Sequence, residues 1–236
     1  MRQDRNHNEL RPVTVEPGYN RYAEGSALVK WGHTHVIATV TLDKRLPPHL
    51  RGQGHKGGWL TAEYALLPRS TQERVQRERL YSGGRTQEIQ RLIGRALRSA
   101  VDLTFFPNQT IIIDVDVLQA DGGTRCAGIL AGYAALHEAA NKLIFSGKVS
   151  EWPLKAEVAA VSVGTVGGKT LVDLEFSEDT KAEVDLNVIA TADGNIVEVQ
   201  GGSEDDPIAA ERYVQLVASG VTAVQHLFEK VRPQLS

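Results

Sequence analysis

The chain has 236 residues, 42% of them hydrophobic, and a formal net charge of −3, so it can bury a substantial core. Its apolar stretches are too short for membrane spans, and its polar, mixed-charge start lacks an apolar signal region, so we expect a cytoplasmic protein. The only cysteine, Cys126, excludes an internal disulfide, and its place early in an apolar helix predicts a buried thiol.

The apolar patterning predicts an α+β fold in one domain over residues 1–236, with a mixed or antiparallel sheet and packed helices. The predicted strands are Ser26–Trp31, His35–Leu42, Leu60–Leu66, Thr110–Leu118, Ala156–Val166, Thr170–Glu175, Val184–Ala190 and Ile196–Gln200. The predicted helices are Thr86–Asp102, Thr124–Phe145 and Ala209–Val231. The turn dipeptides Gly167-Gly168 and Asp193-Gly194 indicate antiparallel hairpins.

A glycine turn, Asp121-Gly122-Gly123-Thr124-Arg125, joins a predicted strand to a predicted helix. Two glycines let the backbone approach a ligand closely, and the amides and positive dipole end of the following helix attract anions of phosphate size. The same residues also fit an ordinary turn in which Thr124 caps the helix.

Arginine is concentrated between Arg69 and Arg98, which carries +5 and leaves −8 for the rest of the chain. Arg85 begins a predicted helix, against the dipole's preference, and a bound phosphate would offer its guanidinium a bidentate partner. The basic connector from Arg69 to Arg79 can present arginines to a phosphate backbone or to a neighbouring subunit. A solvated loop and helix face is the alternative reading.

A third group of residues is acidic, because the stretch from Asp173 to Asp185 is dense in carboxylates and would repel itself without a positive partner. Magnesium or manganese would suit such oxygen ligands, while an acidic surface turn is the alternative. The histidines show no ligand spacing for zinc. Patterns for a serine nucleophile and for a P-loop are missing from the sequence, which leaves phosphate-centred chemistry with a metal.

Several ordered blocks of the sequence resemble the ribonuclease PH family across nearly the whole chain. They are "NELRP" (Asn8–Pro12), "TAEYALLPRST" (Thr61–Thr71), "GGRTQEIQRLIGRALR" (Gly83–Arg98), "LQADGGTR" (Leu118–Arg125) and "EDTKAEVDLNV" (Glu178–Val188). The resemblance implies a ribosomal-protein-like two-layer α+β fold with a mixed sheet and a homohexamer built as a trimer of dimers. It also implies a phosphate-dependent 3′-5′ exoribonuclease, a tRNA nucleotidyltransferase that trims precursor tRNA, releases nucleoside diphosphates and can run backwards. Ribosomal RNA is a further substrate to expect.

The resemblance assigns roles to particular residues. It implies that Arg85, Gly123, Thr124 and Arg125 bind phosphate. It implies that Asp179 and Asp185 form the metal-binding and acid pair, and that Arg69, Arg74 and Arg77 contact RNA or a neighbouring subunit. Cys126 and Gly128 depart from the family's commoner Thr and Ser, which puts one phosphate contact in question. Two rival readings are a non-catalytic RNA-binding ring subunit of an exosome-like assembly and a hydrolytic magnesium nuclease.

Overall fold

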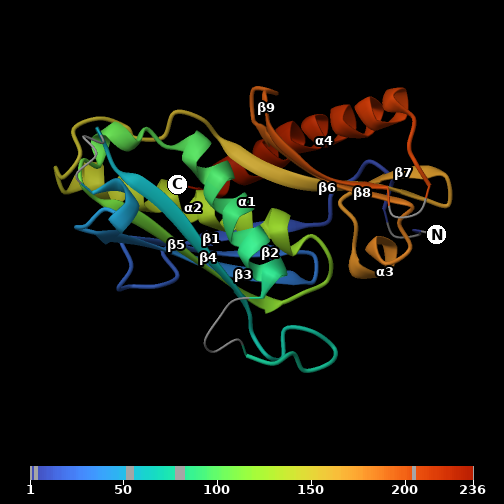
Figure 1. The fold of residues 1–236 in the computed structure, drawn as a ribbon, viewed down its shortest axis with the longest axis horizontal. Coiled ribbons are helices and arrows are strands. Elements are labelled where there is room, and N and C mark those ends of the chain that lie inside the picture. The colour runs from blue at the N-terminus through green and yellow to red at the C-terminus, as the bar shows by residue number, and fades with distance from the viewer. Residues whose placement is uncertain (1, 3–4, 52–55, 78–82, 204–205, 236) are drawn as a thin grey trace.

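The computed structural model describes residues 2, 5–51, 56–77, 83–203 and 206–235. Figure 1 shows the chain as two twisted sheets that are joined through packed helices. The strands are β1 (Val13–Pro17), β2 (Gly25–Trp31), β3 (Thr34–Asp43), β4 (Trp59–Leu66), β5 (Thr110–Gln119), β6 (Val158–Val166), β7 (Lys169–Val172), β8 (Val184–Thr191) and β9 (Ile196–Ser203). The helices are α1 (Gly84–Ala100), α2 (Thr124–Phe145), α3 (Phe176–Asp179) and α4 (Ala210–Val231), with short 3-10 turns at Pro48–Leu50, Leu103–Phe105 and Arg232–Gln234.

The first sheet has the strand order β1-β2-β3-β5-β4 and is mixed, because β4 pairs with β5 in parallel and the other pairs are antiparallel. Along β3, Val36, Ala38 and Val40 are buried and alternate with partly exposed residues, so one face of the sheet packs inward. Helices α1 and α2 cover that face. The carboxyl end of β5 leads directly into the glycine turn before α2.

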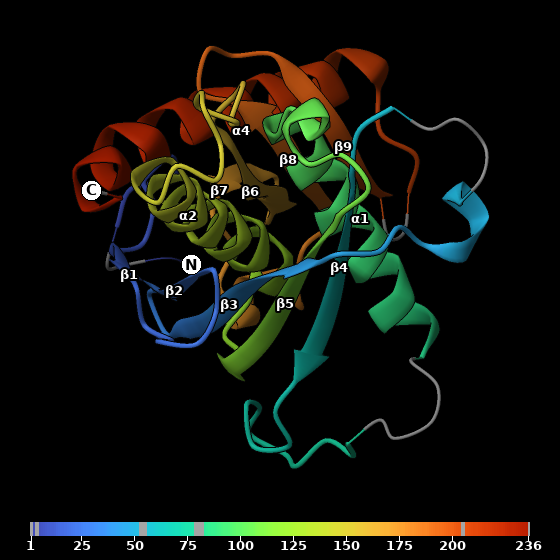
Figure 2. The same cartoon turned by 90° about the vertical axis from the view of Figure 1, so that its left-hand side faces the viewer.

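The second sheet is antiparallel with the order β7-β6-β8-β9, and the predicted hairpins form its β6–β7 and β8–β9 turns. Helix α4 packs on β6 and β8, and Gly220 permits the close approach because a Cβ there would lie 2.5 Å from Val188 Cγ2. Figure 2 shows the resulting layers, with α1 and α2 between the two sheets and α4 on the far side of the second.

Helix α2 is the centre of the core. It is buried almost all round, from Cys126 to Leu143, and packs on β2 and β3 of the first sheet and on β6 of the second. A helix that is apolar on every side belongs in a protein interior. Helix α2 therefore begins between the two sheets, and the glycine turn that precedes it lies there too.

The predicted α+β class with a mixed sheet and packed helices is confirmed. The bounds of α2 agree with the sequence, whereas α1 begins at Gly84 and so contains Arg85. The sequence did not predict β1, whose five residues end in a proline, or the four-residue α3. Within the described part of the chain, no helix combines the length and apolar character that crossing a membrane requires.

Candidate active site

The glycine turn has the geometry that its sequence predicts. Gly122 and Gly123 have φ angles of +71° and +66°, a region that side chains rarely adopt. A Cβ on Gly122 would lie 2.6 Å from the carbonyl oxygen of Leu174, so the turn packs tightly on the loop before α3. Gly123 is the N-cap of α2, and no side chain caps the helix. Thr124 is the first helical residue, so it is not the cap that the alternative interpretation of the turn required.

Polar side chains from the first sheet and the N-terminal segment fix this turn. Thr34 Oγ1 accepts a hydrogen bond from Asp121 N (2.9 Å) and donates one to Gly122 O (2.7 Å). Arg11 Nη1 donates to Asp121 O at 2.6 Å. Backbone groups held on both sides give a preorganised turn, which is what an anion site built from amides requires.

Arg11 is itself held by a buried carboxylate. Its Nη2 lies 2.6 Å from Asp173 Oδ1, its backbone N donates to Asp173 Oδ2 at 2.7 Å, and both side chains are buried. Burial favours a raised pKa for Asp173, but the hydrogen bonds and charge of Arg11, with the charge of Arg5, outweigh it and hold that pKa below its ordinary value. Trp31 Nε1 donates to the same carboxylate at 2.9 Å. The turn is thus tied to Asp173 through one buried ion pair.

Thr124 is contacted by Tyr64 of β4, a residue whose role the sequence does not indicate. The Tyr64 hydroxyl donates to Thr124 Oγ1 at 3.0 Å. Burial raises the pKa of Tyr64, while the hydrogen bond to Thr124 and the charges of Arg85 and Arg125 act in the opposite direction. Glu88, three residues after Arg85 on α1, lies 3.7 Å from Arg125 Nη2, so the structure brings Arg85 close to Thr124 and Arg125.

The two arginines reach this place from different helices. Arg85 lies in the first turn of α1 and is exposed, and Arg125 is the second residue of α2 with 23% of its side chain exposed. The Nε of Arg125 is buried and makes no hydrogen bond to any other described residue. Two helix N-termini and two guanidiniums around a glycine turn form a strongly anion-attracting site.

The acidic stretch divides into buried ion pairs and more exposed carboxylates. Asp173 pairs with Arg5 and Arg11, and Glu178 pairs with Arg2 at 2.6 Å, which supplies the positive partners that the carboxylate density required. Figure 1 shows the N-terminal segment beside β7 and α3, where these pairs form. Asp179 is exposed at the end of α3.

Asp185 lies near the start of β8 and is partly exposed. Asn187, two residues further along β8 and so on the same face, accepts from Cys126 Sγ at 3.3 Å, which places this end of β8 beside the first turn of α2. Gly201 of β9 has a φ of +119°, and a Cβ there would lie 2.0 Å from Asp185 O, so only glycine lets β9 come so close. Among the described residues, no group of three or more His, Cys, Asp or Glu side chains is placed to hold a metal ion.

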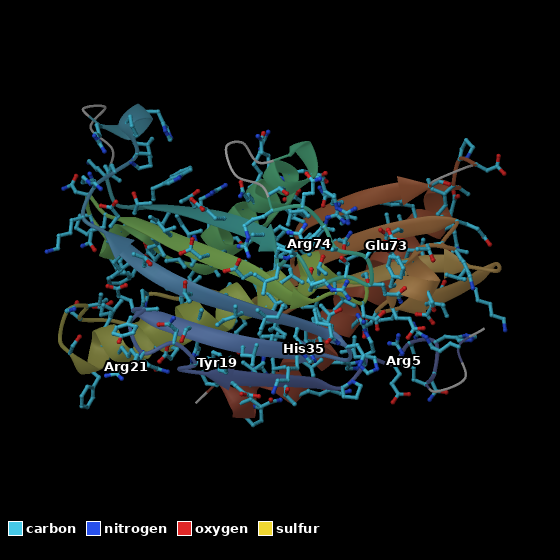
Figure 3. All side chains as sticks on the ribbon, turned by 90° about the horizontal axis from the view of Figure 1, so that it is seen from below. Arg5, Tyr19, Arg21, His35, Glu73 and Arg74 are labelled. Carbon is cyan, nitrogen blue, oxygen red and sulfur yellow. The ribbon has the colours of Figure 1, made fainter. Side chains whose placement is uncertain are left out.

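The predicted basic connector starts next to the glycine turn. Ser70 O accepts a hydrogen bond from Ala120 N at 2.8 Å, which places Arg69 close to the start of the turn. Arg69, Arg74 and Arg77 are exposed, and Figure 3 labels Arg74 between the strands of the first sheet and those of the second. Arg77 lies near Asp116 of β5, whose pKa is raised by burial and partly lowered again by that arginine. Arg79 lies outside the described residues.

Cys126 and Gly128, the two residues that depart from the family pattern, face the protein interior. Cys126 is buried, donates to Asn187 Oδ1 at 3.3 Å, and burial raises the pKa of its thiol, so it is not a nucleophile. A Cβ on Gly128 would meet Val115 Cγ1 at 3.2 Å and Ile93 Cδ1 at 3.4 Å. A serine at position 128 would therefore face the apolar core rather than a bound phosphate.

Comparison with known proteins identifies the family of this chain. A model of the 3′ exoribonuclease family, domain 1, matches residues 9–141, and a model of domain 2 matches residues 156–221. The chain therefore belongs to the 3′ exoribonuclease family. It is 53% identical to ribonuclease PH of Deinococcus radiodurans over 236 residues, which cover all of this chain and 95% of that protein. The expected membership of a 3′ exoribonuclease family is confirmed, and the identity to ribonuclease PH supports the expected phosphate-dependent activity on tRNA.

Solved structures share the fold. The Archaeoglobus fulgidus exosome with RNA bound to the active site matches with a TM-score of 0.80 at 25% identity, over 96% of this chain and 90% of that one. Rice (Oryza sativa) Rrp46 matches with a TM-score of 0.77 at 22% identity, over 99% of both chains. At that lower identity the likeness is one of fold.

Proposed function

We propose that Arg85, Gly123, Thr124 and Arg125 bind the inorganic phosphate that this enzyme uses to shorten RNA. The observation that carries this assignment is the meeting of the N-terminal ends of α1 and α2, where Glu88 Oε1 lies 3.7 Å from Arg125 Nη2 and Tyr64 donates to Thr124. Amides at the start of α2 and the two guanidiniums supply donors on several sides of a tetrahedral anion. Gly123 matters because its positive φ turns the backbone into the helix.

In the proposed reaction, a phosphate oxygen attacks the last phosphodiester of the RNA, the bond to the departing 3′ oxygen breaks, and a nucleoside diphosphate leaves. Arg85 and Arg125 hold the attacking phosphate in line and stabilise charge in the transition state. Asp185 protonates the departing 3′ oxygen, a role that needs it protonated at that step.

Asp179 and Asp185 are the residues that would hold Mg²⁺, or Mn²⁺ in its place. Two carboxylates fit this ion because Mg²⁺ usually keeps several waters and takes remaining ligands from substrate phosphates, so a cluster of three protein ligands is not needed. When bound, the ion would supply charge neutralisation on the transferring phosphate.

The exposed arginines of the connector, Arg69, Arg74 and Arg77, would contact the RNA backbone or a neighbouring subunit. The hydrogen bond between Ser70 and Ala120 places Arg69 beside the start of the glycine turn, which supports an RNA path that ends at the phosphate site. The likeness to a subunit of an exosome, a multi-subunit assembly, supports a homohexamer arranged as a trimer of dimers. A single domain over the whole chain and a cytoplasmic location stay predictions, as does activity on ribosomal RNA.

The test is incubation of the purified protein with a 3′-extended tRNA and magnesium, with and without inorganic phosphate, followed by separation of the nucleotide products. The proposal expects nucleoside diphosphates only when phosphate is present. Monophosphates formed without phosphate would mean hydrolysis, and RNA binding without products would mean a non-catalytic ring subunit. Asp185→Asn tests whether Asp185 protonates the departing oxygen, and Asp193→Asn on the β8–β9 turn is its control. Near-normal phosphorolysis in Asp185→Asn would remove Asp185 from the mechanism.

A further inference from the structure

One acidic side chain lies within the proposed phosphate site. Glu88 follows Arg85 by three residues on α1, so both project near the same end of that helix. Its Oε1 lies 3.7 Å from Arg125 Nη2. The same oxygen accepts a hydrogen bond from Gln200 Nε2 of β9 at 2.7 Å.

The contact between Glu88 and Arg125 is loose compared with a closed ion pair on the same side of the molecule. Arg95 of α1 binds Glu198 of β9 through both Nε and Nη2, at 2.8 and 2.5 Å. The 3.7 Å separation of Glu88 and Arg125 exceeds the usual length of about 2.7–2.9 Å for a charge-assisted hydrogen bond. Arg125 also retains a buried Nε with no partner among the described residues.

An arginine that is only partly engaged can accept a second anion without first breaking a strong bond. Glu88 is the more exposed partner, with 48% of its side chain accessible against 23% for Arg125, so it can move while Arg125 stays in place. Gln200 Nε2 donates to the same carboxylate oxygen that faces Arg125 and holds it near β9.

We propose that Glu88 is a built-in competitor for inorganic phosphate. In the phosphate-free enzyme it partly neutralises Arg125 and keeps the guanidinium oriented toward the glycine turn. Phosphate displaces it, and Gln200 retains the carboxylate beside the site. The affinity for phosphate therefore depends on how much more strongly phosphate binds the Arg125 guanidinium than the Glu88 carboxylate does. This inference rests on the proposed phosphate site and makes Glu88 a positioning residue.

The experiment measures phosphate affinity in the full-length protein carrying Glu88→Gln. Glutamine keeps an oxygen that accepts from Gln200 but removes the competing charge. The KM for inorganic phosphate should fall about two- to fivefold, the range expected for a partly exposed ion pair, while kcat at saturating tRNA stays within about twofold. Stabilisation against heat by phosphate alone, in the absence of RNA, should begin at correspondingly lower phosphate concentrations.

Glu198→Gln is the matched control, because it removes the same charge from the same side of the protein but from the pair with Arg95. An equal fall in KM in this control would mean a general electrostatic effect and would overturn the role of Glu88. An unchanged or raised KM in Glu88→Gln would overturn it as well.

Arg125→Lys separates this inference from the phosphate site on which it depends. If Arg125→Lys leaves the KM for phosphate unchanged, the site assignment itself is wrong. If Arg125→Lys raises that KM and Glu88→Gln fails to lower it, the site stands and only the competitor role is lost.

Discussion

Asp173→Asn should destabilise the protein strongly, because Asp173 neutralises two buried arginines at once. Its carboxylate receives Arg11 N, Nε and Nη2, Arg5 Nη1 and Trp31 Nε1 at distances from 2.6 to 3.1 Å. Asparagine tolerates the left-handed backbone at this position, where φ is +58°, so the substitution tests the charge and not the turn.

The magnitude follows from the burial of the pair. Only 2% of the Asp173 side chain and 7% of the Arg11 side chain are exposed, and breaking such a pair by removing one partner costs about 3–5 kcal/mol. With a urea slope of about 2–3 kcal/mol per molar, the unfolding midpoint should fall by about 1–2.5 M. Tryptophan fluorescence can follow the transition, since Trp31 contacts this carboxylate.

The control is Asp43→Asn, an identical substitution in the surface pair that Asp43 makes with Arg45 at 3.2 Å. Exposed pairs of this kind contribute little, so its urea midpoint should stay close to that of the unmodified protein. If Asp173→Asn shifts the midpoint no further than this control, the argument that the buried pair stabilises the fold is refuted.

Other outcomes can be checked on the same protein. The pKa of Asp173 is lowered in the folded state, so its stabilising contribution should be complete above the unfolded pKa of about 3.9 and be lost as the pH falls through the folded pKa. Urea midpoints measured from pH 6 to pH 3 should therefore fall less steeply in Asp173→Asn than in the unmodified protein. Tyr64→Phe removes the hydrogen bond to Thr124 and should raise the KM for phosphate about two- to tenfold with little loss of stability; an unchanged KM would exclude Tyr64 from the site. Gly201→Ala should destabilise the protein by about 2 kcal/mol or more and lower kcat, because its Cβ would displace the backbone of Asp185; thermal unfolding and single-turnover assays would detect both effects, and a fully stable, active variant would contradict the close packing.

Much of the fold could be predicted from local patterns. Helix α2 was predicted with its observed bounds, because its apolar run is long and begins after a glycine turn. The β6–β7 and β8–β9 hairpins followed from their glycine turns. β1 lacks such signals, being short and ending in Pro17, and it gains its strand conformation by pairing with β2 at the sheet edge.

The site could be predicted only where the signal was local. The glycine turn with Arg125 is contiguous, and Arg85 stands at a helix start, so sequence reasoning found both. Tyr64 could not be assigned a role, because its alternating position on β4 indicates a core residue and its contact with Thr124 spans 60 positions. Arg11 reads as an ordinary surface arginine until Asp173, 162 positions away, is brought beside it.

The pairing of Arg11 with Asp173 has a consequence for the growing chain on the ribosome. Synthesis proceeds from the N-terminus, so Arg85, Gly123, Thr124 and Arg125 are all made before Asp173. Until Asp173 emerges, Arg11 lacks the carboxylate that holds it against Asp121 O. A nascent chain that already contains every proposed phosphate ligand therefore still lacks the fixed turn, and competence to bind phosphate arises only once the second sheet is being made.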